Sequence, residues 1–301
     1  MDGISIIIPC FNSGYFVVDA VESIKSLNIQ ISYEIIIVDD CSTDMETKKI
    51  LTRMRNDSAI KIYRNSRNRG VQYSRNKGLK KSNFNYILPL DADDCLNSNC
   101  YFTKEESIID YSVRILKNNP DVALVQTMSE MFGDFCGYTI SSYPTSEWLA
   151  VHRHHVPTSI IYRREDGLKT LYDAEILKWQ DWSFGVSLMN QRIKEHKKNI
   201  IYFIPKPLHL YRVYNSHNRI SSKLIDEKEV IYKTILRNTE IFRKYFGDID
   251  IKQITQLVYN SSPSRLEELM YVAKFDIRIA KEIIQQRNYN LASSLVGETV
   301  P

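Results

Sequence analysis

The 301-residue sequence has no apolar run that approaches the ~20 residues a transmembrane helix needs. It also has no signal peptide pattern, because Met1 leads directly into an apolar strand pattern at residues 4–8. Its five cysteines form no CxxC pair and leave one odd, which favours a reduced compartment over a disulfide scaffold. The sequence therefore predicts a cytoplasmic protein, with peripheral contact at the inner membrane face left open.

A strong charge of either sign is also missing. The formal net charge is only +4, and basic and acidic residues are interspersed along the chain. A nucleic-acid-binding protein would show a stronger basic balance, so no nucleic-acid partner is expected. The hydrophobic content of 43% and the charged content of 25% are typical of a globular protein with room for one large α/β domain and a smaller appendage.

A glycine-rich phosphate loop is absent after the first apolar run. Residues 9–14 contain one glycine and no basic residue. A nicotinamide oxidoreductase would need GxGxxG at this place, and a sugar-1-phosphate nucleotidyltransferase would need a glycine-rich basic loop. A nicotinamide oxidoreductase is therefore excluded, and a sugar-1-phosphate nucleotidyltransferase is disfavoured.

The sequence does contain apolar strands that end abruptly in acidic residues. Residues 35–38 lead into Asp39 and Asp40, and residues 86–90 lead into an Asp-Ala-Asp-Asp cluster. Side chains alternate along a strand, so Asp91 and Asp93 are expected to point the same way. Carboxylate oxygens are ligands that suit Mg²⁺ or Mn²⁺. The structural alternative is a solvated turn that merely ends the strand.

Strand and helix patterns alternate through the first part of the chain. Strands are predicted at residues 4–8, 33–40, 60–63 and 86–90, and helices at 15–27, 45–55 and 72–81. This alternation predicts an α/β fold with a doubly wound, mostly parallel sheet, which binds ligands at the carboxyl ends of its strands. The polar residues at those ends are Asn12, Asp39, Asp40, Asn68, Gly70, Asp91 and Asp93. Their convergence favours the metal interpretation of the acidic cluster.

The alternation weakens beyond residue 95. A helix is predicted at residues 105–117, strands at 122–126, 158–164 and 200–204, and a helix starting near Trp182. From about residue 225 the pattern is helical, with a break at residues 261–264. The predicted domains are 1–222, with a nucleotide-binding half (about 1–95) and an acceptor half (about 96–222), and a helical region, 223–301. These last helices are expected to pack on the core or on a second subunit, so a homo-oligomer stays open.

Five segments together resemble the bacterial family-2 glycosyltransferases of the GT-A fold. They are residues 5–12, 36–44, 68–78, 90–94 and 179–182, and they occur in the order typical of that family. The resemblance implies an inverting transferase with a doubly wound, Rossmann-like mixed sheet. It also implies a nucleotide-sugar donor (most often a UDP-sugar), Mn²⁺ or Mg²⁺, and a hydroxyl acceptor on a glycan, glycolipid or glycoprotein in polysaccharide biosynthesis.

The resemblance further implies roles for individual residues. Asp181 would be the general base that removes the proton of the acceptor hydroxyl, and Asp93 the direct metal ligand, with Asp91 as a second metal or ribose carboxylate. Asp40 would accept the imide N–H of uracil, while Asp39 holds its loop. The other donor-site candidates are Pro9, Phe11, Asn12, Asn68, Gly70, Arg75, Ala92, Arg212 and Arg219, and His217 is a further candidate metal ligand.

Several of these residues have a structural alternative. Asp181 could be an ordinary N-cap of the helix near Trp182, and the family often has Glu before this Asp, where this chain has Gln180. A catalytically inactive sugar-nucleotide-binding or scaffold protein is therefore an alternative. Arg69 alone is better explained as part of a solvated face. For His217, a basic linker and a role near the metal or diphosphate are equally good explanations. The histidines at 152, 154 and 155 lack a spaced partner for zinc, which favours an acceptor-side or structural role.

Overall fold

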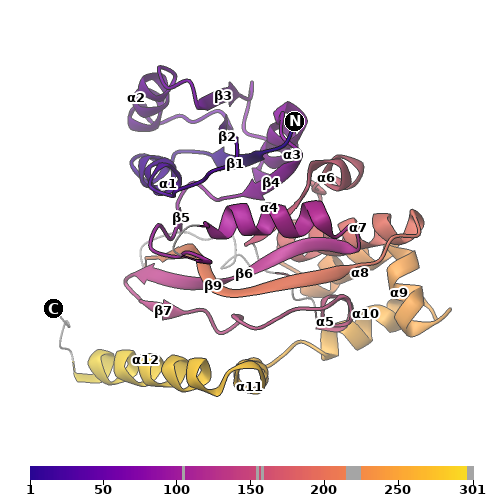
Figure 1. Cartoon of the computed structure of the whole chain (residues 1–301). Helices are drawn as coiled ribbons and strands as arrows, with labels where there is room; N and C mark the ends of the chain where they lie inside the picture. Colours follow the sequence, from indigo (N-terminus) through magenta and orange to yellow (C-terminus); the bar gives the residue numbers. More distant parts are fainter. Residues whose placement is uncertain (104–105, 154–155, 157–158, 215–224, 297–301) are drawn as a thin grey trace.

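The computed structural model describes residues 1–103, 106–153, 156, 159–214 and 225–296. Figure 1 shows a twisted mixed sheet with helices on both faces. The strand order is β3-β2-β1-β4-β8-β6-β9-β5, and β7 pairs with β6. The strands are β1 (Ile4–Cys10), β2 (Tyr33–Asp39), β3 (Ile60–Arg64), β4 (Tyr86–Pro89), β5 (Cys95–Leu96), β6 (Val122–Gly133), β7 (Gly137–Tyr138), β8 (Ile160–Arg163) and β9 (Ile200–Val213).

The helices alternate with the strands in the first half and follow one another at the C-terminal end. They are α1 (Phe16–Lys25), α2 (Met45–Met54), α3 (Val71–Lys81), α4 (Ile108–Asn118), α5 (Glu147–Arg153), α6 (Arg164–Thr170), α7 (Gln180–Lys194), α8 (Glu227–Arg237), α9 (Thr239–Phe246), α10 (Ile251–Asn260), α11 (Arg265–Phe275) and α12 (Ile277–Val296). Among the described helices, none is both long enough and apolar enough to cross a bilayer.

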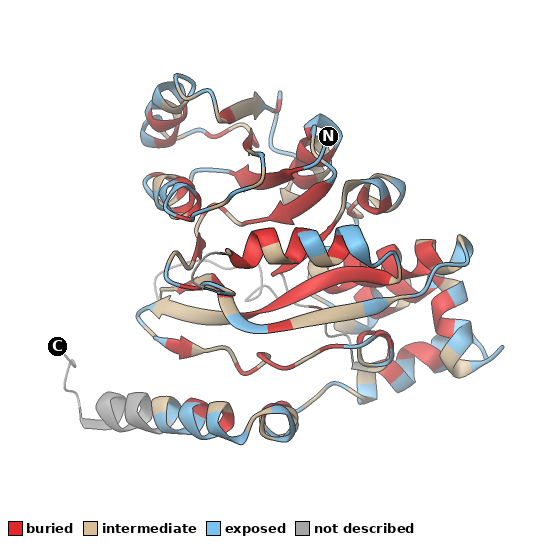
Figure 2. Cartoon of the chain, in the orientation of Figure 1, coloured by how far each residue is buried: buried red, intermediate tan, exposed pale blue. Residues whose placement is uncertain are grey.

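The central strand β1 is buried on both faces, as its continuous apolar sequence predicts. Ile6 and Ile8 belong to the core under α1 and α2, whereas Ile7 packs on the opposite face with Leu79 of α3. Gly78 lets α3 approach this closely, because a Cβ at that position would lie 2.5 Å from Cγ2 of Ile7. Figure 2 shows the resulting buried layer through the middle of the sheet.

The predicted α/β class is confirmed, but the sheet is only partly parallel. β1 pairs in parallel with β2 and β4, and β2 with β3. In the second half, β8 is antiparallel to both β4 and β6, and β5 is antiparallel to β9. The carboxyl ends of β1, β2 and β4 still meet at one edge, which is where ligands bind in such sheets.

The sequence pattern predicts that the last strand ends before Pro205, but in the structure the strand continues. β9 continues through Pro205 and Pro207 to Val213, alongside β6. The pairing shifts register on either side of Met128, and Met128 lies opposite Pro207. Because proline has no N–H for the ladder, such irregularities are the places where a strand accommodates it. The extension matters because it carries His209 and Arg212 to the candidate site.

Other local predictions are also corrected. Asn12 and Ser13 do not cap α1, whose N-cap residue Tyr15 makes no side-chain capping bond, whereas Asp44 does cap α2 through the backbone N–H of Thr47. The helix at α7 begins at Gln180, two residues before the expected start. Three short elements carry no sequence pattern that predicts them, namely β5, α5 and α6.

The C-terminal helices pack in two groups. Ile231 and Ile235 of α8, Phe242 of α9 and Val258 of α10 share a hydrophobic core with α7. Val272 of α11 and residues of α12 pack instead beside Tyr143 and the β7 segment. Figure 1 shows α11 and α12 as an arm along that side of the sheet. The domain division near residue 222 stays a prediction.

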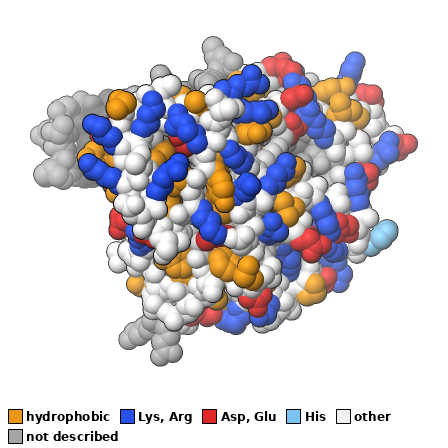
Figure 3. Space-filling model, turned by 90° about the horizontal axis from the view of Figure 1, so that it is seen from above, with side chains coloured by type: hydrophobic (Ala, Val, Ile, Leu, Met, Phe, Trp, Pro, Cys, Tyr) orange, Lys and Arg blue, Asp and Glu red, His pale blue; other side chains and the backbone are white. Residues whose placement is uncertain are grey.

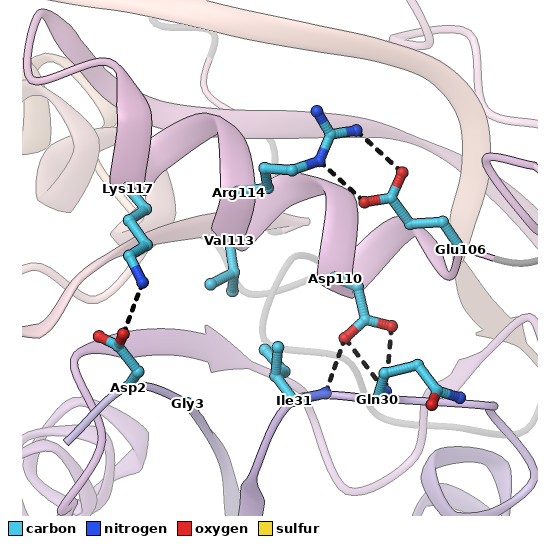
Figure 4. A pocket seen from close by; sticks show the side chains of 9 residues that line it. All are labelled: Asp2, Gly3, Gln30, Ile31, Glu106, Asp110, Val113, Arg114 and Lys117. Carbon is cyan, nitrogen blue, oxygen red and sulfur yellow. Dashed lines mark hydrogen bonds and ion pairs between the residues drawn. The ribbon is translucent and has the colours of Figure 1, made fainter.

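A pocket of about 420 Å³ opens at the amino edge of the sheet (Figure 4). Gly3 and Ile31 line it just before β1 and β2 begin, and α4 forms its opposite wall. Its charged groups are paired with one another or with backbone: Asp110 accepts the N–H groups of Gln30 and Ile31, and Arg114 binds Glu106. The pocket is therefore a seam between α4 and the first strands, at the opposite edge from the candidate site.

Glu34 joins three neighbouring elements of the parallel half. Its buried carboxylate accepts hydrogen bonds from Ser5 of β1 (2.7 Å) and Asn83 before β4 (2.7 Å), and pairs with Lys61 of β3 (2.6 Å). Burial disfavours the charged form, but these donors outweigh that cost, and the pKa of Glu34 is lowered from its usual value.

Replacing Glu34 with Ala should lower the free energy of unfolding by roughly 3 kcal/mol, since it leaves several buried donors without an acceptor. The wild type should also be more stable than Glu34→Gln at a pH above 4.5, the usual pKa of a glutamate. This difference in the free energy of unfolding should be lost as the pH falls through the lowered pKa of Glu34 in the folded protein. Urea unfolding at several pH values measures both. Glu22→Ala, at a site 63% exposed, is the matched control and should change stability by less than about 0.5 kcal/mol. An equal loss of stability in Glu34→Ala and Glu22→Ala would contradict the role of Glu34 in joining these elements.

Candidate active site

The end of β2 is organised by two buried carboxylates. Asp39 accepts the backbone N–H of Ser42 at 2.8 Å and pairs with Arg64 of β3. Asp40 accepts the side-chain amide of Asn65 (2.6 Å) and the backbone N–H groups of Arg69 (2.9 Å) and Gly70 (2.7 Å). Both residues therefore hold loops in the structure, and the role of Asp40 toward a nucleobase stays a prediction.

Neighbouring loops are linked through Asn12, which has a left-handed backbone with φ of 51°. Its side-chain oxygen accepts the backbone N–H of Thr43 at 2.8 Å, and its own N–H donates to Ser42 at 3.0 Å. Cys41 is also left-handed, with φ of 66°. Such strained residues persist where the surroundings hold them, and they cluster at functional sites. Here they place the loops after β1 and β2 side by side.

The remaining donor-site candidates of the first three strands surround these loops. Pro9 is a buried residue of β1, whereas the side chains of Phe11 and Asn68 are exposed. Gly70 precedes α3 with φ of 87°, a conformation that favours glycine. Arg69 lies over the ring of Tyr73 at 3.9 Å, which agrees with the solvated-face explanation given for it.

The Asp-Ala-Asp-Asp cluster forms a turn and does not continue the strand. β4 ends at Pro89, and the backbone N–H of Asp94 donates to the carbonyl of Asp91 at 3.1 Å. The alternation argument for Asp91 and Asp93 is therefore wrong in its premise, because the two residues are not on an extended strand. Ala92 is buried within the turn, and the three carboxylates have different environments.

Asp94 is held from behind by β9. Its two carboxylate oxygens contact Nε2 of His209 (2.9 Å) and the backbone N–H of Arg212 (2.9 Å). Burial opposes protonation of His209, but the adjacent Asp94 outweighs this and the pKa of His209 is raised. These hydrogen bonds connect the turn to the acceptor half of the chain. The sequence pattern did not predict this role for His209.

Arg212 is fully engaged in the same anchor. Its Nε donates to the carbonyl of Asp93 at 2.6 Å and its Nη2 to Asp19 of α1 at 2.8 Å, while its guanidinium lies 4.5 Å from the ring of Phe132. The donor-binding role that the resemblance implies for Arg212 stays a prediction. In the structure its side chain contacts protein groups on several sides.

The centre of the site is a guanidinium between two carboxylates. Arg75 of α3 donates through Nη2 to Asp91 at 2.7 Å and through Nη1 to Asp181 at 3.0 Å. The Arg75 side chain is 3% exposed, and Tyr172 lies 5.2 Å from it. Burial disfavours the charge, but the two carboxylates outweigh it and raise the pKa of Arg75. The acidic turn and Asp181 thus meet at one residue, although Asp181 is distant in sequence.

Asp181 lies in the first turn of α7 and is not its N-cap, which corrects the structural alternative. The N-cap residue is Trp179, with a left-handed backbone (φ of 54°) and no side-chain capping bond. Trp182 fixes the start of the helix, because its buried ring donates to the carbonyl of Ala150 at 2.6 Å. A carboxylate in the first turn also benefits from the positive end of the helix dipole. Asp181 remains 22% exposed, so it is open to a ligand.

The acidic turn has the donor chemistry for a divalent cation. Burial, with the negative charges of Asp94 and Asp91 nearby, raises the pKa of Asp93 to about 6. The Asp93 carboxylate thus carries charge repulsion that a cation would relieve, and oxygen donors suit Mg²⁺ or Mn²⁺. Within the described residues, no group of three His, Cys, Asp or Glu side chains forms a ready metal cage. Asp93 and Asp91 would thus supply only part of a coordination sphere.

Some predicted residues cannot be placed. His217 and Arg219 lie outside the described residues, as do His154 and His155. His152 is described, and it stacks on Trp148 with ring centroids 4.3 Å apart. Its Nδ1 lies 2.9 Å from the carbonyl of Trp148, and its ring also packs on Phe246 of α9 with centroids 4.7 Å apart, so His152 links α5 to α9.

Comparison with solved structures defines the class of fold. The chain is similar to residues 1–349 of TarS from Staphylococcus aureus, solved in complex with UDP-GlcNAc, with a TM-score of 0.65 at 18% identity over 87% of this chain and 71% of that one. It is also similar to a mannosyltransferase from Pyrobaculum calidifontis, solved with GDP-Man and Mn²⁺, with a TM-score of 0.52 at 12% identity over 99% of this chain and 76% of that one. The chain has the GT-A fold.

Sequence comparison then identifies the family. Residues 5–104, a third of the chain, match the model of glycosyl transferase family 2, so this segment is a family-2 glycosyltransferase segment. A stretch of 125 residues, 42% of the chain, is 30% identical to poly-beta-1,6-N-acetyl-D-glucosamine synthase of Staphylococcus epidermidis and covers 28% of that protein. The chain thus matches less than a third of the length of this curated relative.

The raised pKa of Asp93 predicts a stability that depends on pH. Asp93→Asn should raise the free energy of unfolding by roughly 1–3 kcal/mol at neutral pH in EDTA, because it removes a buried and repelled charge. In the wild type the folded pKa of about 6 exceeds the usual 3.8, so stability relative to the variant falls as the pH rises between these values. Below 3.8 the difference should vanish. Thermal unfolding across this range measures it. If Asp93→Asn were less stable than the wild type at neutral pH, the charge of Asp93 would not be destabilising in the folded protein, and the prediction would be wrong.

Proposed function

We propose that this chain is an inverting glycosyltransferase. It moves a sugar from a nucleotide-sugar donor, most suitably a UDP-sugar, to a hydroxyl group of a glycan or glycoconjugate acceptor. A divalent cation, Mn²⁺ or Mg²⁺, assists the reaction, and Asp181 is the general base. The match of residues 5–104 to family 2 supports the reaction class, and the relatives support the donor, since TarS was solved with UDP-GlcNAc.

The observation that carries the proposal is the bridge through Arg75. One guanidinium contacts Asp91 of the acidic turn and Asp181 of α7 at 2.7 and 3.0 Å. A transferase needs a group that receives the nucleotide diphosphate and a base that faces the same reacting carbon. The bridge fixes these two groups in a common geometry at the carboxyl edge of the sheet.

The donor would bind across the ends of β1, β2 and β4. The linked loops at Asn12 and Asp40 would form one wall for the nucleoside, with exposed Phe11 beside them. The diphosphate would lie over the acidic turn, where Asp93 and Asp91 are the candidate cation ligands. A cation bound there would act as a Lewis acid that stabilises the negative charge of the leaving nucleoside diphosphate.

The acceptor would approach from the side of α7. Asp181 would accept the proton of the acceptor hydroxyl while the hydroxyl oxygen bonds to the anomeric carbon and the bond to the diphosphate breaks on the opposite face. Attack opposite to the leaving group inverts the anomeric configuration. Arg75 would act as a positioning residue, because it contacts both carboxylates and is itself withdrawn from solvent.

Release of nucleotide from UDP-, GDP- and dTDP-sugars, measured with Mn²⁺, Mg²⁺ or EDTA and with a set of glycan acceptors, tests the proposal. Asp181→Asn should lower kcat by at least about 100-fold and leave donor binding within a few-fold. Asp93→Ala should remove the part of donor binding that depends on the cation. Asp121→Asn, an exposed surface carboxylate paired with Lys198, is the control and should behave as the wild type.

Donor binding without turnover on any acceptor would favour the inactive binding protein instead. An Asp181→Asn variant as fast as the wild type would exclude Asp181 as the base, and wild-type behaviour of Asp93→Ala would remove the metal site from the proposal.

Replacing Arg75 with Lys tests the bridge itself. A lysine keeps the charge but cannot contact both carboxylates in the planar geometry of arginine. We expect kcat to fall about 10- to 100-fold with a smaller change in KM for the donor. The control is Arg164→Lys on α6, which loses only a hydrogen bond to Ser82. A change confined to KM would instead indicate that Arg75 binds the donor directly.

A further inference from the structure

Basic residues are concentrated in one continuous segment. Residues 45–81, which contain α2, β3 and α3, hold twelve of the 40 Lys and Arg residues but only two of the 36 Asp and Glu residues, Glu46 and Asp57. The rest of the chain therefore has more acidic than basic residues, although the whole carries a formal charge of only +4. The interspersed charges expected from the composition are thus not found in this segment.

Some of these basic residues are paired with acidic groups of the fold, and others are not. Lys61 pairs with Glu34, Arg64 pairs with Asp39, and Arg75 is buried in the site. Seven others are exposed and have no acidic partner among the residues that the structure places. Two of them, Arg67 and Arg69, lie in the loop after β3 at the carboxyl edge. The other five lie on α2 and α3 or at their ends, and we call these five the basic edge: Lys49, Arg53, Arg55, Lys80 and Lys81.

The basic edge covers the outer side of the sheet. β3 is the last strand of the sheet on this side, and the core residues of α2 and α3 belong to opposite faces. Both helices lead from the carboxyl edge back to the amino edge. Arg53, Arg55, Lys80 and Lys81 therefore lie at the helix ends remote from the candidate site. Figure 3 views the molecule from this side, where Lys and Arg side chains are spread over the surface with Asp and Glu side chains among them.

Protection of an edge strand does not account for this arrangement. Charged residues on an outermost strand prevent edge-to-edge aggregation, and Lys61 and Arg64 of β3 already supply that protection. The basic edge lies on the flanking helices and at their ends, where such protection is not needed. We propose that the basic edge is a docking surface for an anionic lipid bilayer.

A bilayer fits this surface better than a soluble polyanion. The cations lie on α2, on α3 and at the ends of these helices, on either side of the outermost strand β3. None of them lines the pocket at the amino edge. The acidic excess of the remaining chain would be repelled by the same plane, which orients the molecule with α2, β3 and α3 toward it. Each Lys or Arg near an anionic membrane strengthens binding roughly fivefold.

Sedimentation with vesicles tests the proposal without any need for enzymatic activity. The full chain should bind vesicles of phosphatidylcholine with added phosphatidylglycerol, bind pure phosphatidylcholine weakly, and dissociate as salt increases. The test variant combines Lys49→Gln, Arg53→Gln, Arg55→Gln, Lys80→Gln and Lys81→Gln. The control variant removes the same number of exposed Lys and Arg elsewhere, through Lys206→Gln, Lys252→Gln, Lys281→Gln, Arg243→Gln and Arg278→Gln.

Loss of binding by more than about tenfold in the test variant, with the control variant within a few-fold of the wild type, is the expected result. Circular dichroism and thermal unfolding establish that both variants are folded. Equal loss in the two variants would show that only net charge matters and would overturn the proposal. Absence of binding to anionic vesicles at low salt would also overturn it. So would binding to polyphosphate, at matched phosphate concentration, that is as tight as binding to the vesicles and depends on the same five residues.

Discussion

The candidate site depends on one buried guanidinium. Arg75 is almost completely withdrawn from solvent, and a charge in that position is costly unless opposite charges compensate it. Asp91 and Asp181 provide the compensation. The fold can therefore bury Arg75 favourably only when α3, the turn after β4 and the start of α7 come together. The arrangement that stabilises the arginine is the same one that assembles the acidic groups of the proposed transferase.

The three acids of the turn show how environment separates identical side chains. Asp91 faces Arg75, and Asp94 faces His209 and the backbone of Arg212, so both have positive or donating partners. Asp93 lies between them, and burial with two negative neighbours raises its pKa to about 6. Because the protein compensates this charge least completely, Asp93 is the carboxylate that we propose as the direct ligand of a cation. Sequence position alone does not make this distinction.

Most of the nucleotide-binding half could be predicted from local patterns. The strands from Ile4 and Tyr33 and the helices between them follow from apolar runs and helical spacing, which operate within a few residues. The failures involve contacts between distant residues. Asn12 binds the loop at Thr43 and so does not cap α1, and β9 continues past its prolines because β6 pairs with it. The link between Asp94 and His209 spans 115 residues, which no local pattern encodes.

The motifs that resemble family-2 glycosyltransferases include the carboxylates Asp91 and Asp181, which the structure brings together, but they do not indicate which residues hold them. Arg75 matches a family motif, yet its two contacts became visible only in three dimensions, because Asp181 lies 106 residues away. Arg212 is likewise a predicted donor-site residue, and the sequence did not indicate that Asp19 and the carbonyl of Asp93 bind its guanidinium. The net charge of the whole chain also gave no indication of the basic segment at residues 45–81, because the acidic excess elsewhere nearly balances it.

The irregular pairing of β9 also makes the acidic turn sensitive to chain length. His209 and Arg212 reach Asp94 only because the strand resumes after Pro207 in the observed register. Side chains alternate between the two faces of a strand, so removing a single residue from 205–207 would exchange the faces of everything that follows. His209 would then turn away from the site while the strand kept nearly its full length. In an alignment of related chains, the spacing between Ile204 and His209 should consequently tolerate substitution far better than insertion or deletion.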